Sequence, residues 1–178
     1  MRIIIARYKI PFLISLMVAL AVVALSAESY WLNAVFAFVG AIIGALIFDI
    51  DFFLYTLFID PADNHSVKLR EQKGIGGYIS YISENEYKFE DLVFRSILFQ
   101  IALIVMTIYV LTTDAFLLVQ TFMVALYGNL VYSQIIEYQK TKSLRRWFWL
   151  HDNELSKNTY LGCIIISLVI FVLFFRFI

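Results

Sequence analysis

Charged residues are scarce in this sequence. Asp, Glu, Lys and Arg make up 16% of the 178 residues, and the 14 basic residues balance the 14 acidic ones. A soluble globular domain has about 25% charged residues, so the composition argues against that class. With a net charge of zero and no basic run interleaved with aromatic residues, nothing in the sequence indicates a nucleic-acid partner.

The sequence also has little cysteine and no complete phosphate-binding loop motif. Cys163 is the only cysteine, which excludes an intramolecular disulfide and any metal site built from several cysteines. It lies in the apolar C-terminal run, where a small apolar residue in a helix is the simplest interpretation. The stretch GIGG at 74–77 lacks the Lys-Ser/Thr pair of a P-loop, and we interpret it as a turn.

Apolar residues are abundant instead. They make up 62% of the chain, aromatic residues make up 17%, and the mean hydropathy is +0.82, values typical of membrane proteins. A segment exposed to lipid must satisfy its own backbone polar groups, so each apolar segment is expected to be a helix. We predict an all-α, polytopic membrane helix bundle with about five transmembrane helices, a single integral membrane domain over residues 1–178. The expected spans are 11–26, 31–58, 92–111, 115–136 and 160–177.

Basic residues predict how this bundle is oriented. Three precede the first span, four lie in the loop at 59–91 and five lie in the loop at 137–159, which together are 12 of the 14. By the positive-inside rule, the N-terminus and both long loops are cytoplasmic and the C-terminus is outside, as in a multi-pass protein of the cytoplasmic (inner) membrane. The N-terminal stretch also resembles a signal peptide; we interpret it as the first span.

Several polar residues interrupt the expected spans at a similar depth. A rise of about 1.5 Å per residue places Asp49, Arg95, Asn129, Ser133 and Glu137 in the cytoplasmic half of the bilayer. The last three are spaced i, i+4, i+8 and share a helical face. We predict an intramembrane polar cluster formed by the second, third and fourth spans. The alternative is that Asp49 and Arg95 neutralise one another while the other residues bond locally to backbone.

The second span carries a second carboxylate, Asp51, two residues after Asp49. On a regular α-helix these side chains point about 200° apart, so both cannot face one site. Either the helix is distorted at IFDID, or one aspartate faces the interface. We assign the deeper residue, Asp49, to the cluster.

These motifs resemble those of a known family. GALIFDID at 44–51, FRSILFQ at 94–100, GNLVYSQ at 128–134 and the following WFW are similar to motifs of the predicted inner-membrane metal-dependent hydrolases. The resemblance extends over residues 40–150. It implies that aspartates and histidines bind a divalent metal near the cytoplasmic face and activate water, a chemistry that suits such ligands.

This sequence departs from the family at the ligand positions. Asp49 and Asp51 match and are the candidate metal ligands, but Phe52, Arg95, Asn129 and Ser133 stand where the family has other ligands. Phenylalanine cannot ligate a metal, and arginine is a permanent cation that would repel one. The two histidines, His65 and His151, lie in the cytoplasmic loops, and either are solvated there or contribute a metal site with Asp60 and Asp152.

We therefore expect a membrane structural or interaction subunit that lacks catalysis and needs no cofactor. One alternative is an active hydrolase that acts on a lipid or lipid phosphate at the inner leaflet, with a divalent metal on Asp49 and Asp51. Another is a small transporter or channel, although polar residues are scarce in the outer half of the spans. The expected partners are the lipid bilayer and, through the GxxxG face of Gly40 and Gly44, a second copy or another membrane protein.

Overall fold

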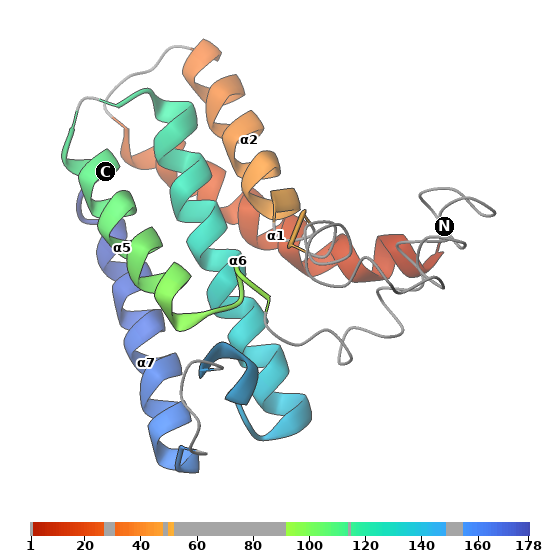
Figure 1. Ribbon diagram of the computed structural model, residues 1–178. Helices are drawn as coiled ribbons and strands as arrows, with labels where there is room; N and C mark the ends of the chain where they lie inside the picture. The colour runs from red at the N-terminus through yellow and green to blue at the C-terminus, as the bar shows by residue number, and fades with distance from the viewer. Residues whose placement is uncertain (1, 27–30, 48–49, 52–91, 114, 149–154) are drawn as a thin grey trace.

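The described part of the molecule is entirely helical. The computed structural model describes residues 2–26, 31–47, 50–51, 92–113, 115–148 and 155–178. Within these ranges the chain forms helices and no strand (Figure 1), which confirms the all-α prediction there. The elements are α1 (Arg2–Leu25), α2 (Trp31–Leu46), α5 (Ile97–Thr112), α6 (Leu117–Thr141), the short 3-10 helix η4 (Arg145–Phe148) and α7 (Lys157–Phe174).

The helix boundaries follow the apolar segments except that α1 begins at Arg2 instead of residue 11 and that the second segment is not one continuous helix. The regular helix of the second segment ends at Leu46 instead of continuing to residue 58, so it stops before both aspartates. Of the remaining segment, only Ile47, Ile50 and Asp51 are described. The predicted loop at 59–91 lies outside the described residues. In the other predicted loop, 137–159, α6 continues to Thr141, and η4 and the start of α7 follow.

Helix α6 is the centre of the fold. It contacts α1, α2, α5 and α7, and residues 124–131 are buried without interruption. Figure 1 shows α6 running between α2 on one side and α5 and α7 on the other, while α1 crosses behind and its N-terminal half extends beyond the other helices. A helix surrounded on all sides buries its whole circumference, which explains why α6 has no single apolar stripe.

A face of small residues lets α2 pack closely on α6. The buried residues of α2 are Ala37, Gly40, Ala41, Gly44 and Ala45. A Cβ atom at Gly40 would overlap the Leu118 carbonyl oxygen, and one at Gly44 would lie 2.9 Å from the Phe122 carbonyl oxygen. The GxxxG pair is thus a close-packing face, as the sequence suggested. Its neighbour in this structure is α6 of the same chain.

The outward faces of the helices are strongly apolar. Met17, Val105 and Val172 are each more than 60% exposed, while Gln100, Asn129 and Gln134 are buried. Two helical stretches, Tyr8–Leu25 and Lys157–Phe174, are long and apolar enough to cross a membrane, whereas α2 and α5 are shorter apolar helices. These features are compatible with a membrane protein. A signal sequence or the core helix of a soluble protein meets the same length criterion.

Candidate functional site

Asp51 joins the end of the second segment to the start of α5. Its side chain is 1% exposed, and its Oδ1 and Oδ2 atoms accept hydrogen bonds from the backbone N–H groups of Val93 (3.1 Å) and Phe94 (3.0 Å). Such bonds satisfy a buried carboxylate and also fix the turn that leads into α5. Asp51 therefore connects two parts of the chain that are 42 residues apart in sequence.

Arg95 and Ser96 lie in this same turn. Arg95 is 7% exposed and is close enough to Asp51 for direct electrostatic attraction. The Ser96 hydroxyl accepts the Phe99 N–H and donates to the Val93 carbonyl oxygen, so it caps the N-terminus of α5. Among the described carboxylates, Asp51 is the one that interacts electrostatically with Arg95. Asp49, which we had assigned to that role, lies outside the described residues.

Asn129 faces α1 and not the turn before α5. Its side-chain amide donates to the Ser15 hydroxyl of α1 (2.9 Å) and to the Ala125 carbonyl oxygen (2.9 Å). The side chain is 2% exposed, and no residue in the described part of the chain donates a hydrogen bond to its Oδ1 atom. Asn129 thus connects α6 to α1, and this contact is not the one that the predicted cluster required.

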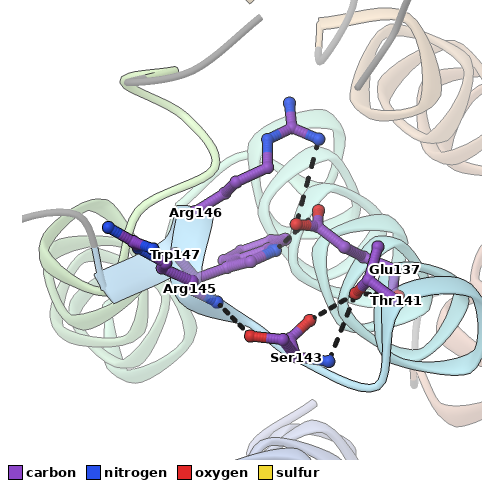
Figure 2. A network of polar contacts seen from close by, with 6 residues as sticks. All are labelled: Glu137, Thr141, Ser143, Arg145, Arg146 and Trp147. Atoms are coloured by element: carbon purple, nitrogen blue, oxygen red, sulfur yellow. Dashed lines mark hydrogen bonds and ion pairs between the residues drawn. The ribbon is translucent and has the colours of Figure 1, made fainter. Parts of the chain in front are cut away.

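Glu137 connects α6 to η4, as Figure 2 shows. Its Oε2 atom accepts a hydrogen bond from the indole Nε1–H of Trp147 (3.1 Å), and its Oε1 atom lies 3.9 Å from the Arg146 guanidinium. Trp147 is fully buried, so the carboxylate supplies the partner that a buried indole N–H requires. Both partners of the Glu137 carboxylate therefore lie in η4, next to the C-terminal end of α6.

Of the remaining candidates, only Ser133 lies within the described residues. Ser133 is half-buried, and no hydrogen bond of its side chain occurs within the described part of the chain. The candidate metal ligands Asp49, His65, His151, Asp60 and Asp152 lie outside that part. Among the described residues, no group of three or more His, Cys, Asp and Glu side chains is placed to hold a metal ion.

A buried polar network that the sequence analysis did not predict crosses three helices. The Gln134 side-chain amide of α6 donates to Gln100 Oε1 of α5 (2.7 Å), and the Gln100 amide donates to the Ser167 hydroxyl of α7 (2.6 Å). The Ser167 hydroxyl donates to the Cys163 carbonyl oxygen, and the Tyr127 hydroxyl donates to the Ser167 carbonyl oxygen. The network connects α5, α6 and α7 through side chains that water does not reach.

A periodic signal for this network is present in the sequence. On α6 two members of the network, Tyr127 and Gln134, lie seven positions apart, and Gln100 and Ser167 each have a buried residue outside the network at the same spacing, Thr107 and Tyr160. Seven residues are nearly two full turns, so such residues share one helical face. The predicted cluster was based on a common depth and on i, i+4, i+8 spacing, which do not select residues at heptad spacing.

Comparisons with protein-family models, with curated proteins and with solved structures return no match to this chain. The chemistry of the site therefore has to be inferred from its own residues. Asp51, Asn129, Glu137 and Gln100 each bond to a different structural element, so each side chain holds two parts of the fold together. In the described part of the chain they do not converge on one reaction centre.

Proposed function

We propose that this chain is a multi-pass helical protein of the cytoplasmic membrane that serves as a structural or interaction subunit and does not catalyse a reaction. The observation that carries the proposal is the distribution of polarity. Buried polar side chains bond helices to one another, while the outward faces consist of large apolar side chains such as Met17 and Val172. Lipid is the solvent that suits such a surface, because exposing it to water would be unfavourable.

The lack of catalysis is supported by how the candidate residues are used. Asp51 accepts two backbone N–H groups beside a permanent cation, Arg95, whose charge opposes binding of a metal cation. Asn129 and Glu137 are bonded to α1 and η4 instead. Asp51 and Asn129 stand where the resembled hydrolases have ligands, and here both have structural partners.

The membrane part of the proposal is tested by extraction of the full-length chain. Membranes that contain the protein are washed with alkaline carbonate, which removes peripheral proteins. We expect the chain to remain in the membrane pellet and to be released only by detergent. Recovery in the carbonate wash would contradict membrane integration.

The non-catalytic part is tested by metal content. The purified protein in mild detergent is compared with Asp51→Asn by elemental mass spectrometry, with Asp114→Asn as a control that makes the same chemical change elsewhere. We expect no stoichiometric divalent metal in any of the three samples. A metal that is lost only in Asp51→Asn would favour the alternative of an active hydrolase, to be assayed on phospholipids and polyprenyl phosphates.

A further inference from the structure

The turn after α6 concentrates positive charge at one end of the bundle. Lys140, Lys142, Arg145 and Arg146 fall within seven residues, and the first three are exposed. From Glu137 to Lys157 the chain has five basic and three acidic residues. One of those acids, Glu137, is buried against Trp147 and Arg146, so its carboxylate faces inward.

The backbone of this turn is held in place by its own hydrogen bonds. Lys142 adopts a left-handed conformation (φ 57°), and its N–H donates to the Tyr138 carbonyl oxygen, which ends α6. The Thr141 hydroxyl accepts the Ser143 N–H, and the Ser143 hydroxyl accepts the Arg145 N–H (Figure 2). Below the turn, the buried Trp147 ring fixes η4 to α6. The backbone that carries the basic side chains is therefore preorganised, and the Lys142 ammonium lies over the Tyr138 ring, 6.0 Å from its centroid.

The start of α7 packs against η4, the short helix that follows this turn. The Phe148 ring of η4 lies 5.9 Å from the Tyr160 ring of α7. Further along α7 from Tyr160, Leu161 and Ile165 are 42% and 58% exposed. A ligand that covers both features needs an anionic head and an apolar tail.

We propose that the basic turn formed by Lys140, Lys142 and Arg145 binds the headgroup phosphate of an anionic phospholipid, whose acyl chains lie along the exposed face of α7. This inference rests on the proposed membrane location. A basic cluster next to a membrane-embedded helix attracts anionic lipid with about a fivefold gain in affinity for each Lys or Arg near the surface. The guanidinium of Arg145 adds the geometry for bidentate phosphate binding.

The test measures lipid binding to the full-length protein in neutral detergent by native mass spectrometry, with titration of phosphatidylglycerol or phosphatidylcholine. The variant Lys140→Gln/Arg145→Gln removes two charges from the turn. Arg176→Gln is the control, because Arg176 is an exposed arginine at the opposite end of α7. Arg145→Lys keeps the charge and tests the role of the guanidinium.

We expect the wild type and Arg176→Gln to prefer phosphatidylglycerol to an equal degree. In the double variant the preference for phosphatidylglycerol over phosphatidylcholine should fall about 10- to 30-fold. Arg145→Lys should keep most of this preference. Equal binding of both lipids by the wild type, or an equal loss in Arg176→Gln, would overturn the proposal. Displacement of the lipid by millimolar glycerol phosphate would also overturn it, since the turn would then be a site for soluble anions.

The experiments distinguish a failure of the lipid site from a failure of the proposed membrane location. Carbonate extraction of the same variants reports membrane integration independently of headgroup preference. A chain that resists extraction but shows no lipid preference contradicts only the lipid site. A chain that carbonate releases contradicts the membrane location itself, and the lipid site with it.

Discussion

At the scale of single residues, the buried polar side chains are structural links, and Asp51 is the most constrained. Both of its carboxylate oxygens accept backbone N–H groups. In Asp51→Asn one oxygen becomes an NH₂ group that faces a donor, which leaves a buried N–H unsatisfied. We expect the free energy of unfolding to fall by about 1–3 kcal/mol. Unfolding by SDS in mixed micelles measures it, and Ser133→Ala is a control that should change little. An Asp51→Asn protein as stable as the wild type would show that these two bonds do not support the fold.

The pair formed by Gln100 and Gln134 makes a second prediction at this scale. Their amides are joined by a 2.7 Å hydrogen bond between α5 and α6. A double-mutant cycle with Gln100→Leu and Gln134→Leu should give a coupling energy of about 0.5–1.5 kcal/mol, the range found for hydrogen bonds between helices in membranes. The control cycle pairs Gln134→Leu with Thr121→Val, whose hydroxyl bonds to the Leu117 carbonyl oxygen within its own helix. That cycle should be additive, and equal coupling in both cycles would argue against a specific bond.

At the scale of helices, the contact between α2 and α6 depends on the absence of side chains. A methyl group at Gly40 meets the Leu118 backbone, which cannot move as the end of a flexible side chain can. Gly40→Ala should therefore destabilise the protein by about 1–3 kcal/mol or more, since inserted atoms force the two helices apart. Gly162 on α7 is the matched control, because nothing lies within 4 Å of a Cβ there. Gly162→Ala should be neutral or slightly stabilising in the same unfolding assay; similar losses in both variants would contradict the packing argument.

The helices also show which features the sequence could predict. Apolar segments locate α5, α6 and α7 to within a few residues, because burial and exposure to lipid both require apolar side chains. The predicted cluster depended on a shared depth and on the spacing of Asn129 and Glu137. Positions eight apart on a helix differ by about 80° around its axis. On α6, which has neighbours on every side, that angle separates a contact with α1 from a contact with η4. Depth can be estimated from sequence, whereas the neighbour on each face depends on the tertiary arrangement.

At the scale of the whole molecule, the connections between helices lie at two opposite ends of the bundle, so the orientation of the bundle in the membrane can be tested. The end of α6 and the start of α7 lie at the basic end, while the short connection between α5 and α6 lies at the other end (Figure 1). Lys140, Lys142, Arg145, Arg146 and Lys157 lie at the first of these ends, and Arg176 lies at the other. The distribution favours a cytoplasmic location for the basic end.

Single cysteines at the two ends test this orientation. In a Cys163→Ser background, Gln139→Cys places a thiol at the exposed end of α6, and Thr113→Cys places one in the α5–α6 connection. We expect a membrane-impermeant maleimide, applied to intact cells, to label Thr113→Cys and not Gln139→Cys. After the membrane is opened, both thiols should react, which controls for accessibility. Labelling of both variants in intact cells would contradict a bundle that crosses the membrane, and the reverse pattern would invert its orientation. Because the two thiols lie at opposite ends of the bundle, the predicted labelling requires that α6 cross the bilayer.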